Sequence, residues 1–389
     1  MSKVVCGTCK KVHETDEGHC PVCGVHHENS YDFGKSDRYL ESMVPGVLEE
    51  RRRRGLQGIT GGLEYVIIST QEEELEPAAR ELVKRTGHLP AGGFIDGEQK
   101  ALVLEKDGSA GIILRHRRSG RNPFREFNMR PKSSRLPDTR LETLVFSVTD
   151  IHHYFREQTD AGRSFQPPGV MDLGSYLYLE TEPSRYTGNA LGFIQWKGRR
   201  GDLVSLERKP LSWTAPESPP QVGENVGFLD HMATRVRAED RDRAIIEFME
   251  LTSYDFDFSV YVKVFNSITN VARLAPEEYA MVFTSGITPF RSMEESGPTE
   301  KFIENYGPRV HHMAFRTDDI ETTFETLVDQ RQRFLIELVG SEEEGLKQTF
   351  TEPSSHTMLV NEYIHRYHGF DGFFTRSNVT LLTGATDRQ

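Results

Sequence analysis

The sequence lacks a long apolar run. None of its windows has the length and apolarity of a membrane span, and the N-terminus "MSKVVCGTCKK" has no apolar stretch typical of a secretory signal. We therefore expect a cytoplasmic protein without a membrane partner. Basic residues are in the minority, since 47 Lys and Arg stand against 59 Asp and Glu, a formal net charge of -12. A negatively charged surface does not attract phosphate groups, so no nucleic-acid partner is expected.

Cysteine is scarce, and all four residues fall within the first 23 positions, in "CGTC" and "CPVC". This spacing predicts a tetrahedral zinc site made by Cys6, Cys9, Cys20 and Cys23. Disulfides are the alternative, but nothing in the sequence indicates an oxidising compartment. Four protein ligands leave zinc no open position, so the metal is predicted to be structural or to help bind a protein partner. The other candidate ligands nearby, interpreted as surface residues, are His13, His19, His26 and His27.

The length of 389 residues allows two or three domains. After the zinc element, "KSDRYLESMVPGVLEERRRRG" predicts a short helix and a linker, with the arginine run in solvent. From Gly61 a βαβββ-like pattern begins and then recurs, and after a proline-rich stretch the pattern starts again. The predicted class is α+β, with tandem domains each made of paired βαβββ units. The predicted boundaries are a zinc-ribbon-like element 1–30, a charged linker 31–58, an N-terminal domain 59–206, a linker 207–225 and a C-terminal domain 226–389.

Internal alignment supports four related units in two pairs. "GGLEYVII" aligns with "GFLDHMAT", and "RLETLVFSVTDI" aligns with "RVHHMAFRTDDI". In these alignments Tyr65 aligns with His231, and Thr143 aligns with His312. The first pair is thus predicted to share the fold of the second pair without its histidines.

The repeated phrases "DHMATR" and "HHMAFR" carry the candidate chemistry. One histidine alone on a half-buried strand is more often a hydrogen-bonded core residue, but pseudo-symmetry would bring His231 and His312 together. Glu362, among apolar neighbours on the last strand, is the candidate third ligand. Two imidazoles and one carboxylate match the facial triad of non-haem Fe(II) oxygenases. His311 is the alternative to His312, although strand alternation predicts that it faces the opposite side.

Residues 226 to about 382 resemble the catalytic domain of the 4-hydroxyphenylpyruvate dioxygenase family, in the vicinal oxygen chelate superfamily. The resemblance lies in "FLDHMA", "YGPRVHHMAFRTDDI", "QTFTEP" and "LVNEYIHRYHGFDGFF". It implies that His231, His312 and Glu362 bind iron and that Gln348 lies near the substrate. It also places three aromatic residues at the segment before a C-terminal gating helix, namely Phe370, Phe373 and Phe374. The first half resembles the family in architecture only, and in that family it carries no metal.

The sequence departs from this family where the substrate is recognised. Thr284, in "FTSG", stands at the position of a family asparagine, and "VFNSITN" places Asn266 and Ser267 near a family serine. Together with Gln348, these residues are predicted to orient the substrate.

The resemblance implies an Fe(II)-dependent dioxygenase that decarboxylates a 2-oxo acid oxidatively and oxygenates the same molecule. One alternative is an extradiol-type dioxygenase or a metal-dependent isomerase, for which the candidate acid/base residues are His365, His368 and Tyr363. Another is a protein that binds a metal or ligand without turnover. A homo-oligomer and a protein partner for the zinc element both stay open.

Overall fold

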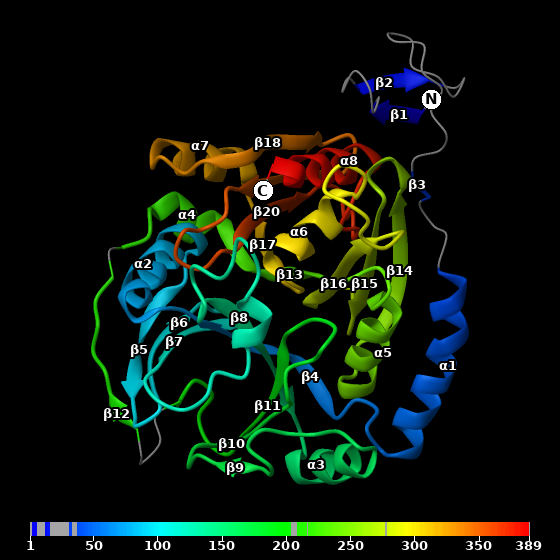
Figure 1. Cartoon of the computed structure of the whole chain (residues 1–389). Helices are drawn as coiled ribbons and strands as arrows, with labels where there is room; N and C mark the ends of the chain where they lie inside the picture. The colour runs from blue at the N-terminus through cyan, green and yellow to red at the C-terminus, as the bar shows by residue number, and fades with distance from the viewer. Residues whose placement is uncertain are drawn as a thin grey trace.

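The computed structural model describes residues 2–5, 12–15, 31–32, 37–203, 208–215, 217–276 and 278–388. The predicted zinc ligands, Cys6, Cys9, Cys20 and Cys23, lie outside these residues. Near the N-terminus, β1 (Ser2–Val5) pairs with β2 (Val12–Thr15). The rest of the described chain is organised around two nine-stranded sheets, one in each half (Figure 1).

The first sheet is built from two successive units. The first unit comprises β4 (Thr60–Ser69), α2 (Leu75–Thr86), β5 (Leu89–Ile95), β6 (Gln99–Glu105) and β7 (Gly111–Arg117). The second comprises β8 (Arg140–Val148), α3 (Ile151–Asp160), β9 (Met171–Asp172), β10 (Tyr176–Glu180) and β11 (Ala190–Trp196). The strand order is β12-β5-β6-β7-β4-β8-β11-β10-β9, where β12 is Lys209–Pro210. The initial strands of the two units therefore pair at the centre of the sheet.

The second sheet repeats this plan. Its first unit comprises β13 (Val226–Arg235), α5 (Arg241–Leu251), β14 (Asp255–Val262), β15 (Ser267–Arg273) and β16 (Ala280–Gly286). Its second unit comprises β17 (Arg309–Thr317), α7 (Ile320–Asp329), β18 (Phe334–Ser341), β19 (Leu346–Thr351) and β20 (Val360–Arg366). The order is β18-β19-β20-β17-β13-β16-β15-β14-β3, with β3 (Tyr31–Asp32) at the edge. Two further helices belong to this half, α6 (Pro298–Tyr306) and α8 (Arg376–Ala385), and α8 packs on β18 and β19.

The α+β class and the four related units are confirmed. The strand registers also agree with the internal alignment: Tyr65 pairs with Gly111 as His231 pairs with Ala280, each on the strand parallel to it. The shared phrases "TDI" and "DDI" have a structural cause. Asp150 caps α3 by accepting a hydrogen bond from the backbone N–H of His153, and Asp319 caps α7 in the same way, which stabilises each helix start by about 1 kcal/mol.

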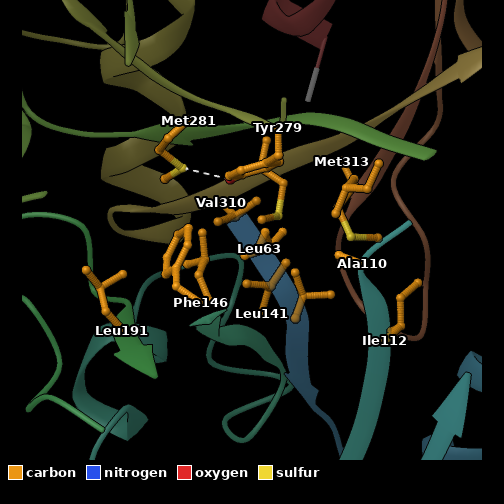
Figure 2. Packing of buried hydrophobic residues seen from close by; sticks show 14 of the residues in the cluster. Leu63, Ala110, Ile112, Leu141, Phe146, Leu191, Tyr279, Met281, Val310 and Met313 are labelled. Carbon is orange, nitrogen blue, oxygen red and sulfur yellow. Dashed lines mark hydrogen bonds between the residues drawn. The ribbon is translucent and has the colours of Figure 1, made fainter. Parts of the chain in front are cut away.

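Each central strand has two buried faces. One face of each sheet packs against the other half, where Leu63, Phe146 and Met313 belong to a single large core (Figure 2). The other face lines the inside of its own curled sheet, with separate apolar clusters in the two halves. The interior of each half is therefore available for a site, whereas the surface between the halves is filled.

The arginine run belongs to a long helix, α1 (Arg38–Arg53), that packs against α5. Arg51 is buried, donates to the carbonyl oxygens of Thr252 and Tyr254 at 2.9 and 3.1 Å, and pairs with Asp255. The prediction of a fully solvated run is wrong at this residue, because its partners lie some two hundred positions away in the sequence.

The position of β5 within the βαβββ pattern has no local signal, because "LPAGGFI" has a proline and two glycines in place of regular alternation. The segment predicted as the linker 207–225 follows the first sheet: β12 pairs with β5, and Trp213 Nε1 donates to the carbonyl oxygen of Gly92 at 2.8 Å. It ends in α4 (Pro220–Asn225), which leads directly into β13. None of the helices within the described ranges combines the length and apolar character needed to cross a bilayer.

Candidate metal centre

Three potential metal ligands come together from neighbouring strands of the second sheet. His231 lies on β13, His312 on β17 and Glu362 on β20. The Nε2 atoms of His231 and His312 are 3.3 and 3.2 Å from Oε2 of Glu362. The three side chains are only 0, 9 and 1% exposed, and their ligand atoms lie within 4.8 Å of one another. Within the described residues, this is the only such group of His, Cys, Asp and Glu side chains.

Asp230 orients His231. Its Oδ1 lies 2.8 Å from His231 Nδ1, and Arg366 donates to both of its carboxylate oxygens at 2.5 and 2.9 Å. Regular alternation would separate adjacent side chains, but the register of β13 with β17 shifts between Leu229 and His231, and this irregularity lets Asp230 reach the ring. Burial disfavours charge on His231, yet Glu362 and Asp230 raise its pKa to about 9. The carboxylates therefore favour a cation at this ring, either a proton or a metal ion.

His312 is held by a different neighbour. Its Nδ1 lies 2.8 Å from Nδ1 of His311, and its ring packs on Phe350 with the centroids 4.9 Å apart. The expectation that His311 faces away is wrong, because the pairing of β17 skips His311 between the partners of Ala233 and Thr234. Burial, reinforced by the nearby histidines and Arg235, holds the pKa of His312 well below its usual range. A neutral imidazole of this kind is the form that binds a metal.

The side-chain amides of Gln348 and Asn378 connect Glu362 to the helix α8 through hydrogen bonds. Gln348 Nε2 donates to Glu362 Oε1 at 2.6 Å and to the carbonyl oxygen of Phe373 at 3.0 Å. Asn378, on α8, donates to Gln348 Oε1 at 3.0 Å. Glu362 Oε2 is left facing the two histidines. Gln348 was predicted to lie near the substrate, and in the structure it contacts the candidate ligand itself.

These residues fit a divalent metal ion. The Nε2 atom of His231 is buried and has no hydrogen-bond partner among the described residues. Donors that share one ion at bond lengths of about 2.1 Å lie about 3 Å apart, close to the observed 3.2 and 3.3 Å. Each donor is held from behind by a hydrogen bond to its other heteroatom, as is usual for metal ligands. Two nitrogens and one carboxylate are a ligand set that suits iron, and they leave its other coordination positions open.

The predicted aromatic residues divide into two groups. Phe373 lies edge-on to His231, with the centroids 5.2 Å apart, and Phe374 packs beside it in the apolar interior. Phe370 lies outside this interior, where it contacts Gly345 and borders a small surface hollow near Asp230. Phe373 therefore closes the centre from solvent, and Phe370 does not contact it.

The three residues predicted to orient the substrate also differ in position. Thr284 lies on the same sheet face as His231, because it pairs with Arg235, which lies on that face. Ser267 lies on this face too, because it pairs with Gly286, two residues beyond Thr284 on β16. Asn266 lies in a turn with φ of 48°, where its side chain accepts from the backbone N–H of Thr288 at 3.0 Å and donates to the Thr288 carbonyl. Asn266 thus shapes a loop.

The acid/base candidates of the alternative chemistries lie away from the triad. Tyr363 donates to the carbonyl oxygen of Arg85 in the first half, and burial raises its pKa above its usual range. His365 contacts the carbonyl oxygen of Thr317 at 2.6 Å, and His368 is exposed beside Glu342. None of the three contacts His231, His312 or Glu362.

Arg235 is a site residue that the sequence analysis missed. It follows His231 and Ala233 on the same face of β13, is 4% exposed, and lies over the ring of Phe302 at 4.3 Å. No acidic side chain of the described residues pairs with it, its Nη1 has no hydrogen-bond partner, and burial lowers its pKa to about 9. It remains a cation at neutral pH. Its only sequence signal is an arginine at an inward position of a core strand.

The Gln348→Ala variant is expected to fold and to bind iron 10–100-fold more weakly. The substitution removes the hydrogen bond that orients Glu362 and breaks the link to Asn378, and loss of a partner behind a metal ligand has an effect of this size. Iron affinity measured by competition with a chelator tests this. The exposed Gln330→Ala variant is the control. Unchanged affinity in Gln348→Ala would remove this residue from the centre.

The comparisons with known proteins concern the fold. No family model and no curated protein matches the sequence. Among solved structures, a variant of 4-hydroxymandelate synthase from Streptomyces coelicolor is similar with a TM-score of 0.63 at 17% identity, over 85% of this chain and 98% of that one. A fusion of a xylose isomerase-like TIM barrel with 4-hydroxyphenylpyruvate dioxygenase has a TM-score of 0.59 at 14% identity, over 90% of this chain and 57% of that one. The chain shares their fold, that of tandem vicinal oxygen chelate domains.

Proposed function

We propose that the chain is an Fe(II)-dependent dioxygenase that decarboxylates a 2-oxo acid oxidatively and oxygenates the same molecule. The observation that carries the proposal is the buried group of His231, His312 and Glu362, whose donor atoms converge in an apolar interior. The fold shared with the 4-hydroxymandelate synthase and the dioxygenase fusion supports it. The polar atoms of Tyr363, His365 and His368 contact other groups, which disfavours chemistry that needs one of them as an acid or base at the triad.

The protein's own contribution is to hold and orient the metal ligands and to exclude water from the site. Asp230 accepts the Nδ1 proton of His231, which leaves Nε2 unprotonated toward the metal, and Arg366 keeps Asp230 in place. His311 has the same role for His312. Bound iron would supply coordination of the 2-oxo acid and of dioxygen. Phe373 and the apolar residues around it keep water from the reacting atoms.

Entry of a substrate requires movement near α8. The triad is buried, and Phe373 lies against His231. Because Asn378 on α8 is hydrogen-bonded to Gln348, and Gln348 to Glu362, displacement of the helix would also release the carboxylate. Opening of the site and orientation of the third ligand are thus coupled.

The test is oxygen consumption by the full chain loaded anaerobically with Fe(II), measured against aromatic, aliphatic, sulfur-containing and dicarboxylic 2-oxo acids. Uptake coupled to carbon dioxide release with one of them is the expected result. Iron bound at one equivalent without uptake on any 2-oxo acid, but with uptake on a catechol, would replace the proposal with extradiol cleavage. Iron binding without any uptake would leave a metal-dependent isomerase or a binding protein.

The Arg235→Met variant is expected to retain iron and to be at least as stable as the wild type, since it removes a buried cation that lacks an acidic partner. If Arg235 meets an anionic group of the substrate, the variant loses turnover on 2-oxo acids with a second acidic group more than on those without one. Urea denaturation and the substrate panel give the two readouts. Loss of stability without a change in substrate preference would show that Arg235 is structural.

Zinc binding at Cys6, Cys9, Cys20 and Cys23 stays a prediction that rests on their spacing. Metal analysis should find zinc in addition to iron, and Cys20→Ser should lower the zinc content without lowering the iron content.

A further inference from the structure

The first half contains a cavity at the place that corresponds to the metal centre. It lies on the inner face of the first sheet and has a volume of about 490 Å³. The strand registers establish the correspondence: Tyr65 occupies the position of His231, Thr143 that of His312, and Gly192 that of Glu362. This half keeps the interior without the metal ligands, and a different set of polar side chains lines it.

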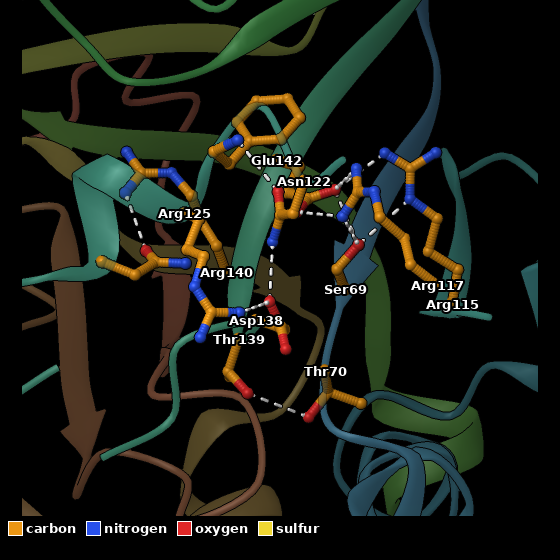
Figure 3. Close-up of polar contacts among 12 residues, drawn as sticks. Ser69, Thr70, Arg115, Arg117, Asn122, Arg125, Asp138, Thr139, Arg140 and Glu142 are labelled. Atoms are coloured by element: carbon orange, nitrogen blue, oxygen red, sulfur yellow. Dashed lines mark hydrogen bonds and ion pairs between the residues drawn. The ribbon is translucent and has the colours of Figure 1, made fainter. Parts of the chain in front are cut away.

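A buried ion cluster borders the cavity. Glu142 accepts hydrogen bonds from Arg115 at 2.7 Å, from Arg117 at 2.6 Å on both of its oxygens, and from Ser69 at 2.6 Å (Figure 3). Burial opposes ionisation of Glu142, but the two guanidinium groups hold its pKa below the usual range. Two cations thus share one anion. Both arginines also line the cavity.

Arg115 retains hydrogen-bonding capacity toward this space. Its Nε donates to Ser69 at 3.0 Å and its Nη2 to Glu142, while Nη1 has no partner among the described residues. Glu180 also lines the cavity but forms no ion pair within the described chain; it accepts from the Tyr178 hydroxyl at 2.5 Å. Burial raises the pKa of Glu180, while the nearby Arg115 and Arg117 oppose this shift.

The remaining walls are apolar and include Ile67, Ile113, Val145 and Ile194. The volume falls within the range of about 300–1,000 Å³ that is usual for small-molecule pockets. The Nη1 group of Arg115 is free to donate into this space, and a guanidinium N–H forms a strong charge-assisted hydrogen bond with a carboxylate. We propose that this cavity binds a small organic acid, with its carboxylate at Arg115 and an apolar or aromatic body against the isoleucines.

The entrance favours the same class of ligand. Exposed Arg121 and half-buried Arg208 also line the cavity, and a neighbouring hollow that shares Arg117 and Arg121 adds Arg118 and Arg125. Arg121, Arg125 and Arg208 are paired with Glu126, Asp138 and Asp96, whereas Arg117, which shares Glu142 with Arg115, and Arg118 add positive charge at this rim. This concentration of arginines occurs in a chain whose net charge is -12. Local basic residues at an entrance raise the rate at which anions arrive. The site is separate from the metal centre, so the proposal does not depend on the proposed reaction.

The test measures binding of benzoate and 3-phenylpropionate, with benzamide and 3-phenylpropionamide as neutral matches, by calorimetry on the full chain. All variants are made in a His312→Ala background, which removes a ligand of the metal centre and with it that route of carboxylate binding. Arg115→Gln removes the anchor and leaves Arg117 to pair with Glu142. Ile113→Phe keeps every charge and fills the cavity. Arg333→Gln is the control, because this arginine is exposed in the second half and lies outside both the cavity and the neighbouring hollow.

In the His312→Ala background, an acid is expected to bind at least tenfold more tightly than its amide. Affinity for the acid is expected to fall tenfold or more in both Arg115→Gln and Ile113→Phe but not in Arg333→Gln. The proposal is overturned if neither acid binds at millimolar concentration, if the amides bind equally well, or if Ile113→Phe leaves the affinity unchanged. If Arg115→Gln fails to fold, the affinity of Ile113→Phe for the acids decides whether the proposal holds.

Discussion

The His312→Ala variant is expected to fold, to lose its iron and to lose turnover together. It removes one of three converging donors, and two donors from a facial set bind a divalent ion far less tightly. The loss should exceed the 10–100-fold expected when a residue behind a ligand is removed. His312 is preferable to His231 for this test, because removal of His231 would also leave the buried carboxylate of Asp230 without one of its partners.

Iron content after anaerobic loading and oxygen uptake are the two measurements. His365→Ala is the matched control, because this histidine lies on β20, three residues from Glu362, and contacts a backbone carbonyl instead of the triad. Wild-type iron content and turnover in a folded His312→Ala protein would eliminate the triad as the metal centre. Loss of turnover with full iron content would instead make His312 a residue that acts on the substrate.

Local repetition carried much of what the sequence could predict. The recurrence of the His-Met-Ala phrase placed His231 and His312 at equivalent points of two units, and the paired units imply a common interior that Glu362 could reach. The same alignment related Tyr65 to His231, which the strand registers reproduce. These inferences depend only on periodicity and internal similarity, and both are properties of short segments.

The failures occur where strands are irregular or where contacts are distant. Alternation misdirects Asp230 and His311, because each lies at a register shift between β13 and β17. The pairing of Arg366 with Asp230 spans 136 positions, and no local pattern shows which arginine will meet which carboxylate. Arg51 was misjudged for the same reason.

The ion cluster of the first half was missed because its members come from several strands. Ser69, Arg115 and Glu142 lie on β4, β7 and β8, and each is an ordinary polar residue in its own segment. They become unusual only when the sheet brings them together and buries them. A search for histidines passes over such a site.

Glu142→Gln is expected to lower the free energy of unfolding by about 3–5 kcal/mol. The substitution keeps the size of the side chain but removes its charge, so two largely buried guanidinium groups lose the carboxylate that pairs with both of them. The control is Glu126→Gln, where the carboxylate and its partner Arg121 are 87 and 84% exposed at 3.5 Å and little change is expected. Urea denaturation of both variants at neutral pH gives the comparison.

The stability difference between the wild type and Glu142→Gln is expected to depend on pH. The arginines hold the pKa of Glu142 below its value in the unfolded chain, about 4.3, so the ionised carboxylate stabilises the fold fully above that pH. This contribution is lost as the pH falls through the folded-state pKa, whereas the glutamine variant has no such group to titrate. The stability difference between wild type and Glu142→Gln should therefore be largest at neutral pH and shrink below about pH 4.3. A difference that stays constant into acid would mean that Glu142 stabilises the sheet by packing and hydrogen bonding, and that its charge does not hold the two arginines.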